Sequence, residues 1–210
     1  MLDFQSPMAS TAPPGSPATF NIRMGSTLRF SDDELFELCG RNPELRIERS
    51  AEGDLIVMTP AGGASGHRNA GILRALGEWA RRDGTGLGFD SSTGFLLANG
   101  AMRAPDAAWV QRSRLEPLSP EDKERFLPLT PDFVVELRSP SDRIADLEAK
   151  MAEYLSQGAR LGWLIDPQER QVHVYCAGQA VEILDEPAEV AGDPELSGFV
   201  LELAPIWAPL

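Results

Sequence analysis

Apolar and polar residues alternate in several short runs of this chain, which is the pattern of β-strands, because successive strand side chains point to opposite faces. The run 132–138 places Phe133 and Leu137 on one face and Glu136 and Arg138 on the other. Charged groups on an apolar strand are costly to bury without partners. This face of the run is therefore a candidate for a polar site.

The remaining runs of this kind are bounded by turn residues such as glycine, proline and asparagine, which favours short strands rather than long helices. Strands are predicted over 45–49, 54–58, 87–91, 94–97, 102–110, 132–138, 161–166 and 171–175, with short strands near 180–184 and 199–204.

Helical signals occur in three segments. Ser31 followed by Glu34 is the pattern of a capping box. A Gly-rich loop, 60–66, precedes a segment whose apolar residues repeat at helical spacing. Ser-Pro-Ser-Asp at 139–142 is typical of a helix start, with proline in the first turn. Helices are predicted over 32–39, 67–82 and from 139 to about 157.

The order of these elements predicts an α/β fold. A helix between the strands 132–138 and 161–166 favours a parallel crossover, whereas the early strands form an antiparallel hairpin, so a mixed β-sheet flanked by helices is expected. Residues 1–20 are rich in Pro, Ser and Ala and are predicted to form a disordered tail. Residues 21–210 are long enough for a single domain with its own core.

Charge changes the functional expectation. The chain has 32 acidic and 19 basic residues, which gives a formal net charge of −13 at pH 7. A surface of this sign repels a polyanion, so the overall charge argues against tight DNA binding. Arginines on one predicted helix could supply a local basic surface, although solvated helix charges are the commoner case. These arginines are Arg68, Arg74, Arg81 and Arg82.

The cysteine content and the hydropathy of the chain indicate its cellular compartment. Cys39 and Cys176 are the two cysteines, and they lack the CxxC spacing of a structural zinc site. A reducing cytoplasm is the expected compartment. No apolar run approaches the roughly 18 residues that a membrane span requires, so no membrane association is expected.

Two acidic residues in separate apolar strands form the candidate active site. Asp106 follows Pro105, and Glu136 lies thirty positions later. Carboxylates hold hard divalent cations such as Mg²⁺ or Mn²⁺, and such a cation activates its bound water and offsets charge on a phosphate. Arg138 shares a strand face with Glu136 and could stabilise the same charge. The pattern favours metal-dependent phosphodiester hydrolysis.

Pro-Asp, a long gap and then Glu-x-cation resembles the PD-(D/E)XK nuclease superfamily. More narrowly, MRAPDAAWV, PDFVVELRSPSDR, GWLIDP and IVMTPAGGASGHRNAGILRAL are similar to the Uma-type family of endonucleases, over residues 31–175. The resemblance implies a restriction-endonuclease-like core with additional N-terminal strands, and Asp106 and Glu136 as ligands of Mg²⁺ or Mn²⁺. It further implies nucleic acid, with DNA expected, as substrate, and a homodimer that cuts both strands.

The chain departs from the superfamily motif at its lysine, because Arg138 stands there. Arginine keeps its charge at ordinary pH and is a poor general base. Lys150 lies at the edge of the apolar stripe of the following helix, next to Leu147 and Tyr154, and some superfamily members place the motif lysine on this helix. Lys150 is therefore the hypothesised substitute. A lysine that extends from the rim of a core stripe is the alternative.

Three further residues are weaker candidates. Glu48 would be a third metal ligand, since superfamily members often take an acid from an N-terminal element; a solvated strand acid is the alternative. His67 and Arg68 begin the helix after the Gly-rich loop, where free backbone N–H groups can hold a substrate phosphate. An ordinary first-turn histidine is the competing interpretation.

Three functions stay open at this point. The first is a metal-dependent endonuclease that uses Asp106, Glu136 and Lys150. The second is a catalytically inactive interaction or scaffold protein of the same fold, favoured by the acidic surface and by Arg138. The third is a two-carboxylate glycosidase, opposed by the presence of only four Trp and two Tyr to line a sugar cleft. Metal binding and cleavage of nucleic acid separate the first two.

Overall fold

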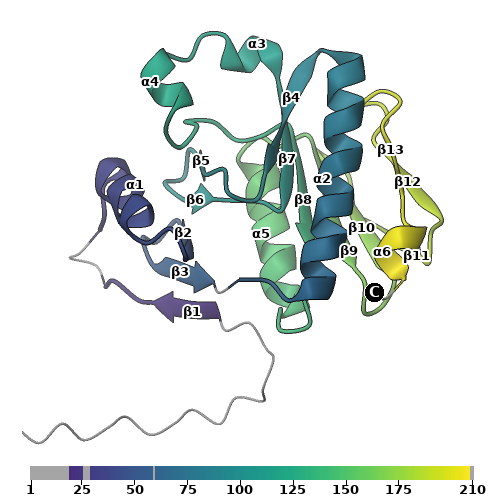
Figure 1. The fold of residues 1–210 in the computed structure, drawn as a ribbon, viewed down its shortest axis with the longest axis horizontal. Helices are drawn as coiled ribbons and strands as arrows, with labels where there is room; N and C mark the ends of the chain where they lie inside the picture. The colour runs from purple at the N-terminus through teal and green to yellow at the C-terminus, as the bar shows by residue number, and fades with distance from the viewer. Residues whose placement is uncertain (1–18, 26–28, 59, 209–210) are drawn as a thin grey trace, which may run out of the picture.

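A six-stranded sheet forms the centre of the fold (Figure 1). The structure is a computed structural model, and it describes residues 19–25, 29–58 and 60–208. The strand order in this sheet is β11-β10-β9-β8-β7-β4. The strands are β4 (Gly86–Asp90), β7 (Ala107–Gln111), β8 (Phe133–Leu137), β9 (Leu161–Asp166), β10 (Gln171–Cys176) and β11 (Glu182–Asp185).

A second sheet of five strands lies beside the first and carries α1 (Asp32–Arg41). Its order is β1-β3-β2-β6-β5, and its own small core joins the helix to the strands. The Ser31 capping box with Glu34 that the sequence predicts is confirmed. The strands are β1 (Thr19–Ile22), β2 (Arg46–Arg49), β3 (Leu55–Met58), β5 (Phe95–Leu96) and β6 (Met102–Arg103).

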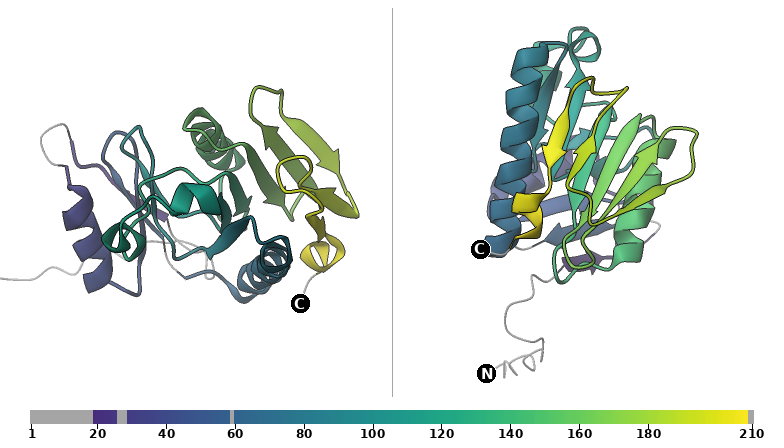
Figure 2. Two further views of the ribbon diagram at one scale, coloured as in Figure 1. Left: turned by 90° about the horizontal axis from the view of Figure 1, so that it is seen from above. Right: turned by 90° about the vertical axis from the view of Figure 1, so that its right-hand side faces the viewer.

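Helices cover both faces of the six-stranded sheet (Figure 2). On one face α2 (Gly63–Asp83) packs with the hairpin of β12 (Glu189–Ala191) and β13 (Val200–Glu202) and with α6 (Ala204–Trp207). On the other face lies α5 (Ile144–Ser156). The short helices α3 (Arg112–Leu115) and α4 (Pro120–Lys123) follow β7.

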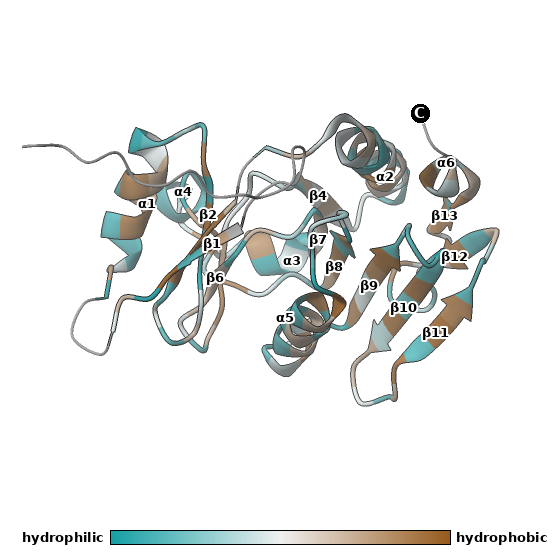
Figure 3. Ribbon diagram, turned by 90° about the horizontal axis from the view of Figure 1, so that it is seen from below, coloured by the Kyte–Doolittle hydropathy of each residue, from teal (hydrophilic) through white to brown (hydrophobic). Residues whose placement is uncertain are grey.

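Burial on two faces explains the composition of the central strands. In β8 the side chains of Phe133, Val135 and Leu137 pack toward α2, as the alternation predicts, while Val134 packs toward α5. A strand with helices on both sides reads as a nearly continuous apolar run. Figure 3 shows this contrast, with apolar residues along β8 and β9 and mixed polarity on α1 and α5. Glu136 is therefore an exception that the packing has to accommodate.

The predicted α/β fold with a mixed sheet is confirmed. Strands β8 and β9 are parallel and are joined through α5, which is the expected crossover. The other strand pairs in the six-stranded sheet are antiparallel. The early hairpin of β2 and β3 is also antiparallel, with Arg49 opposite Leu55.

The single strand predicted over 102–110 is wrong. The segment forms β6 and β7, which belong to different sheets. Pro105 has no N–H to donate to a strand ladder and it fixes the backbone, so the chain leaves one sheet there and enters the other. Asp106 consequently lies at the junction of the two sheets.

Both long helices begin elsewhere than predicted. The segment Ser139–Asp142 is a turn, in which an Asp142 side-chain oxygen accepts the Ser139 N–H at 2.8 Å, so α5 starts only at Ile144. A short polar side chain that bonds nearby backbone favours turns as readily as helix caps. In contrast, α2 starts at Gly63 and takes in residues that were expected in the Gly-rich loop.

The ends of the chain add two observations. Of the tail predicted over 1–20, Thr19 and Phe20 belong to β1, and the rest lies outside the described residues. Within the described ranges, no helix combines the length and the apolar character needed to cross a membrane.

Gly86 allows a close approach between β4 and β7. A Cβ added at Gly86 would lie 2.4 Å from the Trp109 ring and 2.4 Å from the Val110 carbonyl oxygen, whereas at Gly88 the nearest atom is 3.7 Å away. We expect Gly86→Ala to lower the free energy of unfolding by about 2 kcal/mol, because overpacking displaces the ring or the strand. Urea denaturation measures this change.

Gly88→Ala on the same strand is the matched control. It should stay within about 0.5 kcal/mol of the wild-type free energy of unfolding. Equal losses in the two variants would show that the space beside Gly86 does not limit the packing of β4.

Candidate functional site

A pocket of about 520 Å³ lies where the two sheets meet. Six charged residues line it, and four of them come from separate parts of the fold. Arg46 stands on β2, Asp106 between β6 and β7, Glu136 on β8 and Lys150 on α5. The pocket thus collects groups that are far apart in the sequence.

Strand register brings Asp106 to Glu136. Ala107 is paired with Val135 in an antiparallel ladder, so the residue before Ala107 lies beside the residue after Val135. One Asp106 carboxylate oxygen, Oδ2, accepts the backbone N–H of Leu137 at 2.9 Å. The other, Oδ1, accepts from Arg46 Nη1 at 3.1 Å. Asp106 is thereby fixed at the C-terminal end of β8.

Glu136 is a buried carboxyl group, with 3% of the residue exposed. Its Oε1 lies 2.8 Å from Lys150 Nζ and accepts the hydroxyl of Tyr154 at 3.1 Å. Burial raises the pKa of Glu136, the charges of Asp106 and Glu48 raise it further, and Lys150 offsets only part of this rise. A cation near this carboxylate would therefore be favoured.

Lys150 lies between two glutamates. Its Nζ is 2.8 Å from Glu136 Oε1 and 2.8 Å from Glu48 Oε1, and 13% of its side chain is exposed. Burial opposes the charge, but Glu136 and Glu48 together raise the pKa of Lys150 above its ordinary value. Lys150 is thus a charged group, suited to stabilising negative charge rather than to accepting a proton.

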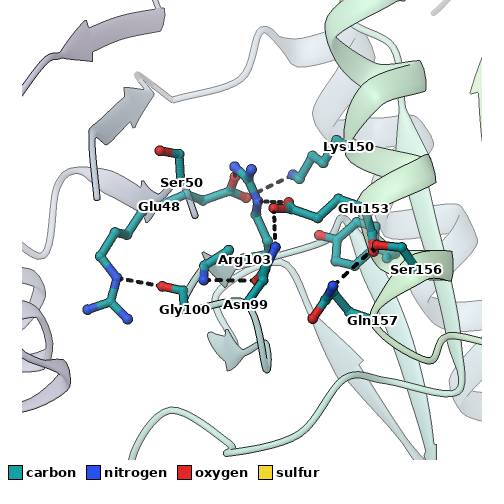
Figure 4. Close-up of polar contacts among 12 residues, drawn as sticks. Glu48, Ser50, Asn99, Gly100, Arg103, Lys150, Glu153, Ser156 and Gln157 are labelled. Carbon is teal, nitrogen blue, oxygen red and sulfur yellow. Dashed lines mark hydrogen bonds and ion pairs between the residues drawn. The ribbon is translucent and has the colours of Figure 1, made fainter. Parts of the chain in front are cut away.

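Glu48 belongs to a buried ion network beside the pocket (Figure 4). Its Oε1 accepts from the Ala104 N–H at 3.0 Å and from Lys150, and its Oε2 from Arg103 Nη1 at 3.3 Å. Arg103 Nε donates in turn to Glu153 at 2.6 Å. In the close-up, Lys150 and Arg103 approach Glu48 from different elements. Both oxygens of Glu48 are occupied by protein groups, and Glu48 does not line the pocket.

The surrounding cations keep Glu48 ionised. Burial would raise the pKa of this carboxyl group, but Lys150, Arg103 and Arg46 outweigh that effect and lower it. The same lysine therefore faces one glutamate that is stabilised as a carboxylate and another, Glu136, that is not. Glu48 anchors Lys150 to the five-stranded sheet.

Arg138 lies apart from the pocket. Its Nη1 is 2.6 Å from Asp166 Oδ2, and its Nε donates to the Asp142 carbonyl at 3.4 Å. The side chain therefore ties the end of β8 to the end of β9 rather than facing Asp106 or Glu136. Arg138 and Glu136 were expected to act together because they share a predicted strand face, but the two side chains have different partners.

His67 and Arg68 are also outside the pocket. His67 is exposed in the second turn of α2, because the helix begins at Gly63. Arg68 Nε donates to the carbonyl of Ile206 at 2.7 Å and so holds α6 against α2. The free N–H groups of the first turn belong to residues 63–65, of which Ser65 lines the pocket, whereas the Gly66 N–H donates to the Gly62 carbonyl at 2.9 Å.

Sequence reasoning missed three members of the site: Arg46, Arg103 and Tyr154. Arg46 and Glu48 are two residues apart on one strand and so share a face, the same signal that singled out Glu136 and Arg138. Arg103 and Tyr154 have no such local signal. Arg103 reaches Glu48 through the register of β2 and β6, and Tyr154 reads as an ordinary core residue of α5.

Within the described residues, no group of three or more His, Cys, Asp and Glu side chains could hold a metal. Mg²⁺, however, commonly uses one or two carboxylates and completes its shell with water and substrate phosphate. Asp106 and Glu136 line one pocket side by side, and four acids of the cluster face three cations. This donor set fits a cation that keeps most of its water.

Comparisons with known proteins concern the family and the fold. The model of the family Uma2, described as "putative restriction endonuclease", matches residues 32–204. A crystal structure from Anabaena variabilis ATCC 29413, described as a putative nuclease belonging to DUF820, superposes with a TM-score of 0.70. It is 22% identical, and the match covers 85% of this chain and 97% of that one. The fold is thus restriction-endonuclease-like. No curated protein matches the chain.

Removing the charge of Glu48 should destabilise the fold. We expect Glu48→Gln to cost about 3 kcal/mol, because it leaves Lys150 and Arg103 buried with fewer counter-charges. Guanidinium denaturation followed by tryptophan fluorescence measures the loss. Glu37→Gln, in the exposed pair with Arg41, is the control and should change stability by less than about 0.5 kcal/mol. A Glu48→Gln variant as stable as the control would mean that the network adds nothing to the fold.

Proposed function

The chain belongs to the Uma2 family, and on this premise we propose that it is a metal-dependent endonuclease that hydrolyses phosphodiester bonds of nucleic acid, with DNA as the expected substrate. The observation that carries the proposal is that two acids, Asp106 and Glu136, line one pocket together with Lys150, whose ammonium group lies 2.8 Å from Glu136.

Asp106 and Glu136 would hold Mg²⁺ or Mn²⁺. The bound ion would supply an activated water and offset charge on the phosphate. The chain's own groups set the geometry: the Leu137 N–H fixes Asp106, and Tyr154 orients Glu136 through its hydroxyl. Glu48 takes no part as a ligand in this proposal, because it does not line the pocket and its oxygens accept from Lys150, Arg103 and the Ala104 N–H.

Lys150 is the proposed catalytic cation. Held by Glu48 and Glu136, its ammonium group would stabilise negative charge that builds on the phosphate. Because its pKa is raised, Lys150 keeps its positive charge and is not suited to act as a general base. Arg138, the other candidate, would act only on the structure, through its pair with Asp166.

A homodimer is part of the proposal, because a single site of this size acts on one strand at a time. The second candidate function is a nuclease-fold scaffold without activity. Its specific support is the net charge of −13, which opposes binding of a polyanion. The two candidates differ in metal binding and in cleavage.

Removal of either acid should abolish activity. We expect wild type with Mg²⁺ or Mn²⁺ to nick supercoiled plasmid, and Asp106→Asn and Glu136→Gln to lower the rate at least about 100-fold, because each keeps its shape but loses the charge that binds the ion. Gel electrophoresis of time courses measures the rate.

Glu169→Gln, an exposed acid in the turn after β9, is the control and should cleave like wild type. If wild type neither binds Mn²⁺ in calorimetric titration nor nicks the plasmid, the endonuclease proposal is wrong and the scaffold is favoured.

Substitution of Lys150 should reduce cleavage, whereas substitution of Arg138 should reduce stability. Lys150→Met should reduce cleavage at least about 100-fold. Arg138→Met should retain most cleavage but unfold at lower denaturant, because Asp166 stays buried without its partner. Parallel rate and denaturation measurements test both. Full activity of Lys150→Met combined with loss of activity in Arg138→Met would reverse the assignment.

A further inference from the structure

Arg46 is an arginine at the wall of the pocket that is bound to a candidate metal ligand. It stands first in β2, and its Nη1 donates to Asp106 Oδ1 at 3.1 Å, while Nη2 donates to the Ala104 carbonyl. About a third of the side chain, 31%, is exposed. The guanidinium therefore reaches from the five-stranded sheet to the carboxylate that the six-stranded sheet positions.

The guanidinium groups of two neighbouring arginines are more completely hydrogen-bonded to protein acceptors than that of Arg46. Arg49 on the same strand donates through Nε, Nη1 and Nη2, and Arg103 donates through Nε and Nη1 to two glutamates. Neither lines the pocket. The Nε of Arg46, by contrast, is buried and has no hydrogen-bond partner within the described residues. A buried donor without an acceptor is unfavourable, so this position leaves Arg46 incompletely bonded.

The position of Arg46 conflicts with a divalent cation at Asp106. A guanidinium and a metal ion beside one carboxylate repel each other at contact distance. Arg46 also faces Glu48 and Glu136, whose charges attract it in the same way that they would attract a metal. The two cations are therefore alternatives at Asp106. In the absence of metal, the guanidinium supplies the counter-charge.

On the premise of the proposed nuclease function, we propose that Arg46 is a counter-cation that a divalent metal displaces from Asp106, and that its released guanidinium binds the phosphodiester of the substrate in the same pocket. The planar fork of arginine matches the oxygens of a phosphate. Release would also free the orphaned Nε as a donor. Arg46 would then be a catalytic residue that touches the substrate, beside Lys150.

The proposal predicts effects of opposite sign on metal binding and on catalysis. In Arg46→Gln the competing cation is lost, so the affinity for Mn²⁺, measured by calorimetric titration without substrate, should rise about 3- to 10-fold. Cleavage of supercoiled plasmid at saturating Mn²⁺ should fall about 100-fold or more, because a donor to the phosphate is gone. A residue that only supports the fold would not tighten metal binding.

Arg49→Gln is the matched control, since it removes a second arginine of β2, which is buried and lies outside the pocket. It should lower thermal stability yet leave Mn²⁺ affinity and cleavage at saturating Mn²⁺ as in wild type. Arg46→Lys is the second variant, and it covers the case in which Arg46→Gln does not fold. It keeps the charge without the fork, so Mn²⁺ affinity should stay near wild type while cleavage falls about 10-fold.

The outcomes separate the inference from its premise. If wild type binds Mn²⁺ and cleaves, but Arg46→Gln binds Mn²⁺ no more tightly, or Arg46→Gln and Arg46→Lys cleave like wild type, the inference is overturned and the proposed function stands. If wild type neither binds Mn²⁺ nor cleaves, both are overturned. Tighter binding with slower cleavage in Arg46→Gln supports the inference.

Discussion

The buried charge of Lys150 joins the two sheets of this protein. Its ammonium group contacts Glu48 from the five-stranded sheet and Glu136 from the six-stranded sheet, at 2.8 Å each, and the lysine itself belongs to a helix. An unpaired ammonium in this position would be very costly, and so would either glutamate alone. Strands β2 and β8 and helix α5 therefore pack favourably only when all three charged groups are paired. The candidate site and the packing of the two sheets depend on the same contacts, so a change in one group affects both stability and chemistry.

The two glutamates differ although they share a cation. Burial raises the pKa of both carboxyl groups, but Lys150 and Arg103 outweigh this effect at Glu48 and lower its pKa. At Glu136 the charge of Asp106 adds to the effect of burial, and the pKa is raised. Neighbouring acids with oppositely shifted pKa values are typical of functional sites, because such shifts are needed for chemistry and not for packing. A cation that binds at Asp106 would remove the repulsion. The net negative charge of the chain argues against binding of a polyanion. In this pocket, however, the excess of carboxylates attracts a cation, which is what a metal-dependent nuclease needs.

Much of the fold followed from local patterns, because strands, the Ser31 cap and the β8–α5–β9 crossover are written in short stretches of sequence. Asp106 and Glu136 could be singled out because each interrupts an apolar run. Partners set by long-range register could not be found in this way: Arg103 meets Glu48 only because β6 pairs with β2. The predicted start of α5 was wrong because the residues Ser-Pro-Ser-Asp occur both at helix N-termini and in turns, and here they form a turn. Arg138 was misplaced because a shared strand face does not fix a shared partner.

The turn between β8 and α5 has a consequence for how this family can vary. Residues 139–143 precede the helix and contribute no ion pair to the buried cluster, and residues 144–150 set the angle at which Lys150 leaves the helix axis. One residue inserted within those two turns would rotate the lysine by about 100° and move its ammonium away from both sheets. One residue inserted before Ile144 can be absorbed by the turn. Length variation among relatives should therefore collect on the N-terminal side of α5, while the spacing from Ile144 to Lys150 stays constant.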